Sequence, residues 1–233
     1  MSSMKNLIAI LSMTLFFVAG SARAEEQAEP RILAIGDSLI AWHMLTRQSI
    51  TDAVSKELDE PAVSRAVGGA RVLFNLPGVA ELGMRISSQY QEGDWDWVIM
   101  NGGGNDLWFG CGCKSCDAKL DKLINVEEKS GGIPKQIDKA LESGAKVLWV
   151  GYLRSPGVDS LIEECRDEGD ELEARIADYA KATDDLHFLS IADLVPEGDL
   201  TFHGMDRIHP SLKASREIGE RVAKLIRKVD PDR

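Results

Sequence analysis

The sequence predicts an α/β protein with a parallel five-stranded sheet and helices on both of its faces. Short, strongly apolar runs typical of buried strands alternate along the chain with longer segments whose apolar residues recur at helical spacing. Such alternation favours parallel strands, because each connecting helix crosses over and packs against the sheet. The first three apolar runs also end at glycine-rich turns, as strands that feed into helices often do.

The five apolar runs have the length of strands and are bounded by turn-forming residues. The first ends at Gly36, the second at Gly68, and the third at Asn101, which is followed by three glycines. In chain order, the predicted strands are Arg31–Ile35, Ala62–Val67, Trp95–Met100, Lys146–Tyr152 and Phe188–Ile191.

Five further segments place apolar residues on one helical face, at the spacing of helices that cover a sheet. The residues that share a face are Ile50, Ala53, Val54 and Leu58; Val79, Leu82, Ile86 and Tyr90; Ile133, Ile137, Ala140 and Leu141; Leu161, Cys165, Leu172, Ile176 and Tyr179; and Ile218, Val222, Leu225 and Val229.

Residues 1–24 are typical of a signal peptide. Lys5 precedes a nearly continuous apolar run from Leu7 to Val18, and Ala22-Arg23-Ala24 places small residues where signal peptidase cleaves. An uncleaved membrane anchor is the alternative, but the run is shorter than the ~20 residues of a membrane span. We expect cleavage after Ala24, and a single domain over residues 25–233 that is periplasmic or secreted.

Charge and cysteine content narrow the possible partners. The net charge of −11 disfavours nucleic acids and anionic lipid surfaces. No later segment resembles a transmembrane helix, so stable membrane insertion is not expected.

In an oxidising compartment, four cysteines predict two disulfides in one of three pairings. A zinc site is the alternative, since a Cys-x-Cys-x-x-Cys cluster and one distant cysteine supply four thiolates. The cysteines are Cys111, Cys113, Cys116 and Cys165.

Residues that could take part in catalysis follow the first three predicted strands. Ser38 lies in Gly36-Asp37-Ser38-Leu39, Gly69 follows the second strand, and Asn105 lies in Gly103-Gly104-Asn105-Asp106. Because ligand sites of open α/β sheets lie beyond the carboxyl ends of the strands, we expect these residues at one edge.

A fourth motif, Asp206-Arg207-Ile208-His209-Pro210, supplies a histidine with a carboxylate three residues before it. A serine hydroxyl needs a base to accept its proton, and imidazole suits that task near neutral pH. We therefore expect His209 to act on Ser38, with Asp206 orienting the ring. His203 is an alternative base if Asp206 pairs backward with it.

These motifs resemble those of the SGNH (GDSL) hydrolase family, over most of the chain after the signal peptide. The resemblance implies a flavodoxin-like three-layer fold without metal or organic cofactor. It also implies that Ser38 is the nucleophile, His209 the base and Asp206 the orienting acid. The amide of Ser38, Gly69 and Asn105 would form the oxyanion hole. The motifs are Ile35-Gly36-Asp37-Ser38-Leu39, Val67-Gly68-Gly69-Ala70 (in which Gly68 is the alternative to Gly69), Gly103-Gly104-Asn105-Asp106 and Asp206 to Pro210.

Two features are particular to this chain. Arg207 occupies a position that is often small in the family; it either lines the substrate pocket, where it would favour an anionic group, or points to solvent. The segment from Leu107 to Lys119 carries Trp108, Phe109 and three cysteines. We expect a disulfide-pinned loop that places Trp108 or Phe109 against the substrate. The alternative is a structural staple whose aromatic rings pack into the core.

Together these residues predict an exported serine ester hydrolase, and the family resemblance implies short-chain acyl esters or O-acetylated carbohydrate as its first candidate substrates. Lysophospholipids and thioesters are the next substrates to consider. An acyl transferase is the alternative on the same fold, with a sugar hydroxyl in place of water. A non-catalytic envelope binding protein and a metal or redox module built on the cysteines are alternatives of other classes.

Overall fold

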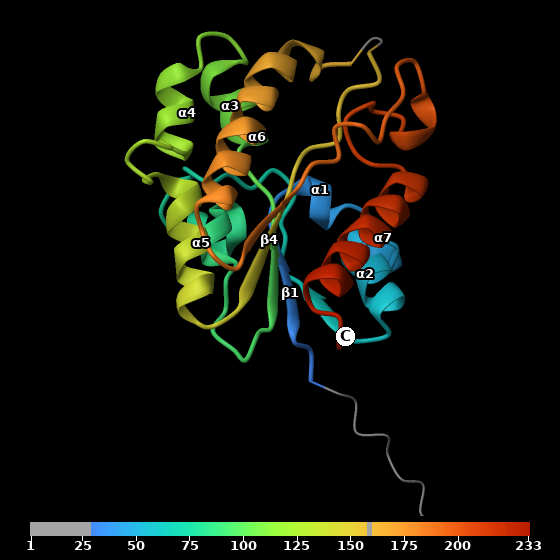
Figure 1. Cartoon of the computed structure of the whole chain (residues 1–233). Helices are drawn as coiled ribbons and strands as arrows, with labels where there is room; N and C mark the ends of the chain where they lie inside the picture. Colours follow the sequence, from blue (N-terminus) through green and yellow to red (C-terminus); the bar gives the residue numbers. More distant parts are fainter. Residues whose placement is uncertain (1–28, 158–159) are drawn as a thin grey trace, which may run out of the picture.

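The computed structural model describes residues 29–157 and 160–233; the predicted signal peptide, residues 1–24, lies outside the described residues. Five parallel strands form one sheet in the order β2-β1-β3-β4-β5 (Figure 1). The predicted fold class is therefore confirmed. The strands are β1 (Ile32–Ile35), β2 (Ala62–Ser64), β3 (Trp97–Met100), β4 (Lys146–Val150) and β5 (Leu186–Leu189).

Helices cover both faces of the sheet and complete three layers (Figure 1). Alternate residues of β1 enter two different cores: Ile32 and Ala34 pack with α1, α2 and α7, and Leu33 and Ile35 pack with α3 to α6. This alternation follows from the two-residue repeat of a strand. The helices are α1 (Ser38–Ala41), α2 (Ile50–Leu58), α3 (Gly104–Cys111), α4 (Asp117–Leu123), α5 (Gly132–Glu142), α6 (Arg166–Lys181) and α7 (Leu212–Val229).

The two long helices on the α1 face begin at serine caps. The Ser49 side chain accepts from the backbone N–H of Asp52, whose carboxylate accepts from the Ser49 N–H, which forms a capping box for α2. Ser211 caps α7 through the backbone N–H of Ala214. Each cap satisfies backbone donors that the first turn of a helix leaves unpaired.

The single helical face predicted for Val79, Leu82, Ile86 and Tyr90 is wrong. The segment forms a short π-helical turn, η2 (Ala80–Met84), and a 3-10 turn, η3 (Ile86–Ser88). Gly83, within η2, has a φ of +97°, which no regular helix allows. Leu82 is consequently 78% exposed, while Ile86 is buried.

The expected loop from Leu107 to Lys119 is mostly helical. Its first residues complete α3, and its last residues begin α4. The connection between the two helices carries Cys113. Leu161, expected on the face of α6, precedes that helix and is 70% exposed. The short helices η1 (Met44–Thr46), η4 (Glu163–Cys165) and η5 (Leu200–Phe202) were not predicted.

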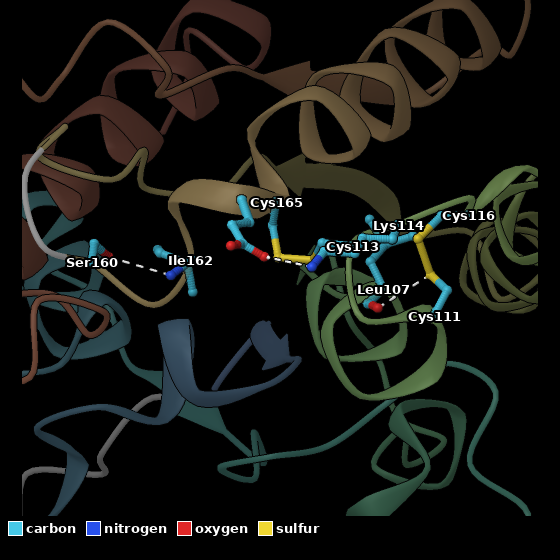
Figure 2. The surroundings of a disulfide bond; sticks show 9 residues. Leu107, Cys111, Cys113, Lys114, Cys116, Ser160, Ile162 and Cys165 are labelled. Atoms are coloured by element: carbon cyan, nitrogen blue, oxygen red, sulfur yellow. Dashed lines mark hydrogen bonds and ion pairs between the residues drawn. A yellow bond between two sulfur atoms is a disulfide. The ribbon is translucent and has the colours of Figure 1, made fainter.

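The four cysteines form two disulfides, Cys111–Cys116 and Cys113–Cys165, as Figure 2 shows. The first closes a local loop between α3 and α4. The second joins that connection to the start of α6, across a sequence separation of 52 residues. This pairing is one of the three that the sequence left open, and it ties together the elements beside the candidate site.

Candidate active site

The turn after β1 presents Ser38 as the first residue of α1. Asp37 caps the helix, because its Oδ1 accepts from the backbone N–H of Leu39 at 3.0 Å and from Nδ2 of Asn101 at 3.0 Å. Its other oxygen accepts from the hydroxyl of Tyr152 at 2.5 Å. Burial raises the pKa of Asp37, and these hydrogen bonds oppose the rise. Asp37 therefore stabilises the turn that presents Ser38.

His209 and Asp206 are paired within the loop that precedes α7. Nδ1 of His209 lies 2.6 Å from Oδ2 of Asp206, and Oδ1 of Asp206 accepts from the backbone N–H groups of Ile208 and His209 at 3.0 Å each. Burial acts to raise the pKa of Asp206, but these hydrogen bonds hold it below its ordinary value. Asp206 therefore faces the ring as a carboxylate, and its partner is His209 rather than His203.

Trp42, just after α1, stacks on the imidazole of His209. The two ring centroids are 3.7 Å apart and the rings are within 5° of parallel. The next residue, His43, places Nε2 3.1 Å from the backbone oxygen of Pro210. Trp42 and His43 both lie within a few positions of Ser38 in the sequence. The structure shows that they join the helix of Ser38 to the loop of His209.

Asn105 lies in the first turn of α3, against the segment that follows β2. Its Nδ2 donates to the backbone oxygen of Ala70 at 3.1 Å, and an amide nitrogen carries a second N–H that remains for a ligand. The carboxylate of Asp106 accepts from the backbone N–H groups of Val72 and Leu73 at 2.8 and 2.9 Å. These bonds hold the Gly69 turn beside α3. Gly69 has a φ of +78°, a conformation that favours glycine.

Ser38, Asn105 and His209 line one cavity of about 130 Å³. Trp108 from α3 lines it too, and so does Tyr152, on a wall formed by residues that follow β4. The rest of that wall consists of Leu153, Arg154 and Ser155, and further lining residues are Ile162, Cys165 and Leu172.

Three residues that were predicted to contact the substrate or the oxyanion are not among the described residues that line this cavity: Gly69, Phe109 and Arg207. Phe109 is 61% exposed, and its ring stacks on Trp108 with centroids 4.8 Å apart. Of the two aromatic residues proposed for substrate contact, Trp108 is therefore the one at the cavity. Helical geometry explains the difference, because consecutive residues of α3 point about 100° apart.

The cationic side chains that line the cavity have carboxylate partners. Arg154 contacts Glu173 at 2.7 Å and Asp170 at 2.6 Å, and Arg166 pairs with Glu163. Their charges are thus balanced within the wall. The cavity combines a hydroxyl, an imidazole and an amide with largely apolar walls, which suits a small, mostly uncharged substrate group.

Comparisons with known proteins identify a family and a shared fold. The model of the GDSL-like lipase/acylhydrolase family matches residues 34–216. No curated protein matches the sequence. A carbohydrate acetylesterase from Sinorhizobium meliloti has the same fold, with a TM-score of 0.60, 19% identity, and coverage of 86% of this chain and 100% of that one.

Two other esterases are similar in structure. The aryl esterase of M. smegmatis has a TM-score of 0.60 and 18% identity, with coverage of 86% and 99% of the two chains. The psychrotrophic esterase EstA from Pseudoalteromonas sp. has a TM-score of 0.57 and 16% identity, with coverage of 84% and 96%. At these identities the likeness shows a shared fold. With its family match over most of its length, the chain belongs to the GDSL-like lipase/acylhydrolase family.

Proposed function

We propose that this protein is a serine ester hydrolase in which Ser38 is the nucleophile. One observation carries the proposal: the side chains of Ser38, Asn105 and His209 line the same cavity, and Asp206 binds the far nitrogen of the His209 ring. A nucleophile, a base with its orienting carboxylate and an amide donor are the groups that acyl transfer requires.

The chemistry follows from these positions. With a proton on Nδ1 held by Asp206, the imidazole of His209 presents Nε2 as a base for the hydroxyl of Ser38. Ser38 attacks the acyl carbonyl, and His209 returns the proton to the leaving alcohol. Water activated by His209 then releases the acyl group from Ser38. The developing oxyanion accepts hydrogen bonds from the backbone N–H of Ser38, the backbone N–H of Gly69 and the side chain of Asn105.

The cavity supports a short acyl group. Its volume of about 130 Å³ is well below the ~300–1,000 Å³ of sites for drug-sized ligands. Trp108, Leu153 and Leu172 provide apolar walls. The similar structures include enzymes described as a carbohydrate acetylesterase and an aryl esterase. We propose short-chain acyl esters or O-acetylated carbohydrate as substrates, with Trp108 against the substrate.

We also propose that the domain, residues 25–233, is exported after cleavage at Ala24. The leader-like sequence of residues 1–24 supports this, and so do the two disulfides, which persist in oxidising compartments. In residues 29–157 and 160–233, no helix has the length and apolar character needed to cross a membrane.

The test is hydrolysis of p-nitrophenyl esters from acetate to palmitate by the mature protein and by Ser38→Ala. We expect activity on acetate to fall at least about a thousandfold in this variant, as for other serine nucleophiles. Ser130→Ala is the matched control, because Ser130 binds Glu128 outside the cavity and should leave activity unchanged. Full activity of Ser38→Ala would refute the mechanism. Efficient acyl transfer to an added sugar with little hydrolysis would instead identify a transferase.

A further inference from the structure

The hydroxyl of Tyr152 bonds to residues beside both Ser38 and Asn105. It donates to Oδ2 of Asp37 at 2.5 Å and accepts from the backbone N–H of Gly104 at 2.9 Å. Asp37 immediately precedes Ser38, and Gly104 immediately precedes Asn105. One phenol thus links the turn after β1 to the start of α3.

The ring of Tyr152 is held close to α3 by its surroundings. A Cβ built at Gly104 would lie 2.8 Å from the ring carbon that carries the hydroxyl, so a glycine is needed for this approach. The backbone of Tyr152 is also held, because its N–H donates to Oε1 of Glu173 at 2.8 Å, and Glu173 also binds Arg154. The fixed backbone and the close contact with α3 restrict the position of the ring.

The hydroxyl can make both bonds only while it is protonated. Burial, and then the negative charge of Asp37, raise the pKa of Tyr152 well above its ordinary value. The phenol therefore remains a donor to Asp37 throughout the pH range in which a histidine base works. Phenylalanine would retain the ring and lose both bonds.

We propose that Tyr152 is a positioning residue that sets the spacing between Ser38 and the amide of Asn105. This inference rests on the proposed hydrolase function. Oxyanion donors act only when they lie about 2.7–3.1 Å from the developing charge. A small shift of α3 therefore weakens the hydrogen bonds that stabilise the transition state. Ground-state binding depends less on that spacing. Loss of the hydroxyl should therefore lower kcat and leave KM nearly unchanged.

Tyr152→Phe tests the proposal, with Tyr179→Phe as the matched control. Tyr179 also donates its hydroxyl to a carboxylate, Oδ1 of Asp138 at 3.0 Å, but it reaches from α6 to α5 and does not line the cavity. For p-nitrophenyl acetate we expect kcat of Tyr152→Phe to fall about ten- to hundredfold, the range for a lost hydrogen bond to a charged group. KM should change less than twofold, and Tyr179→Phe should keep the parental kcat.

A second variant gives the same test if Tyr152→Phe folds poorly. Gly104→Ala leaves the hydroxyl in place but pushes the ring away from α3, and we expect a similar fall in kcat. Circular dichroism and thermal unfolding identify the folded variants. The rate at which a fluorophosphonate labels Ser38 provides a readout without turnover, and it should fall in parallel with kcat.

The outcomes separate this inference from the function on which it rests. An inactive wild type, or an active Ser38→Ala, would overturn the hydrolase function itself. A wild type that depends on Ser38, together with a folded Tyr152→Phe that matches Tyr179→Phe in kcat, would overturn the positioning role alone. A higher KM with unchanged kcat would also overturn it, because Tyr152 would then bind substrate.

Discussion

Removal of the Cys113–Cys165 disulfide should destabilise the protein about twice as much as removal of Cys111–Cys116. A cross-link restricts the unfolded chain, and the entropy that it removes grows with the logarithm of the loop that it closes. The two loops have sequence separations of 52 and 5 residues. At 25 °C these lengths correspond to losses of about 4 kcal/mol and about 2 kcal/mol in the free energy of unfolding.

The two disulfides form a closely matched pair for this comparison. Each joins one buried cysteine, Cys113 or Cys116, to one that is partly exposed, Cys165 or Cys111. Replacing each pair by two alanines therefore removes a similar amount of packed sulfur, and the difference in stability reports mainly the loop length.

Urea unfolding of the two double variants, followed by circular dichroism, measures the difference in the free energy of unfolding, and thermal unfolding measures the melting temperatures. The melting temperature should fall by about 8–16 °C without Cys113–Cys165 and by about 4–8 °C without Cys111–Cys116, from the usual 2–4 °C per kcal/mol at this size. Equal losses in the two variants would refute the loop-length argument. They would show that local contacts, rather than the entropy of the unfolded chain, determine what each disulfide contributes.

Two other changes have defined outcomes. Trp42→Ala removes the ring stacked on His209 and should lower kcat/KM for p-nitrophenyl acetate about three- to tenfold. Trp42→Phe keeps an aromatic ring, so its loss, expressed as free energy, should be less than half of that for Trp42→Ala. Equal losses in the two variants would contradict a stacking role. Hydrogen bonds from Arg31 and then Arg233, against the effect of burial, lower the pKa of Asp96 to about 2. Because the folded-state pKa lies below the unfolded value, this stabilisation is complete above about pH 4 and is lost as the pH falls toward 2. After allowance for solvent screening, Asp96→Asn should lower the free energy of unfolding by about 1 kcal/mol at pH 7 and by little near pH 2. Urea unfolding at the two pH values measures these losses, and a loss that does not depend on pH would contradict the role of the ionised Asp96.

The sheet was predictable because its signals are local. Buried strands need continuous apolar runs, and each predicted run contains or overlaps an observed strand. The least accurate was the last: β5 begins at Leu186 rather than Phe188, because an edge strand is less uniformly apolar. Periodicity failed between Val79 and Tyr90, where a left-handed backbone at Gly83 interrupts the helix. A pattern of apolar residues carries no information about that dihedral angle.

The candidate site was partly predictable for the same reason. Ser38, Asn105 and His209 lie in short motifs that follow strands or precede a helix, and the parallel sheet brings the first two to one edge. The pairing of His209 with Asp206 depends on a spacing of three residues, which is visible in the sequence. The stacking of Trp42 on His209 joins segments far apart in the chain, and no local signal indicates it.

The sequence by itself determined the fold class, the family motifs and the presence of cysteines that can cross-link. Only the tertiary structure decided which cysteines pair, that Trp108 rather than Phe109 lines the cavity, and that the hydroxyl of Tyr152 connects Asp37 to Gly104. The physical reason is the distance along the chain over which each kind of signal acts. Periodicity and motif spacing report on neighbours along the chain, whereas disulfides, cavities and buried hydrogen bonds depend on contacts between residues that meet only when the layers pack.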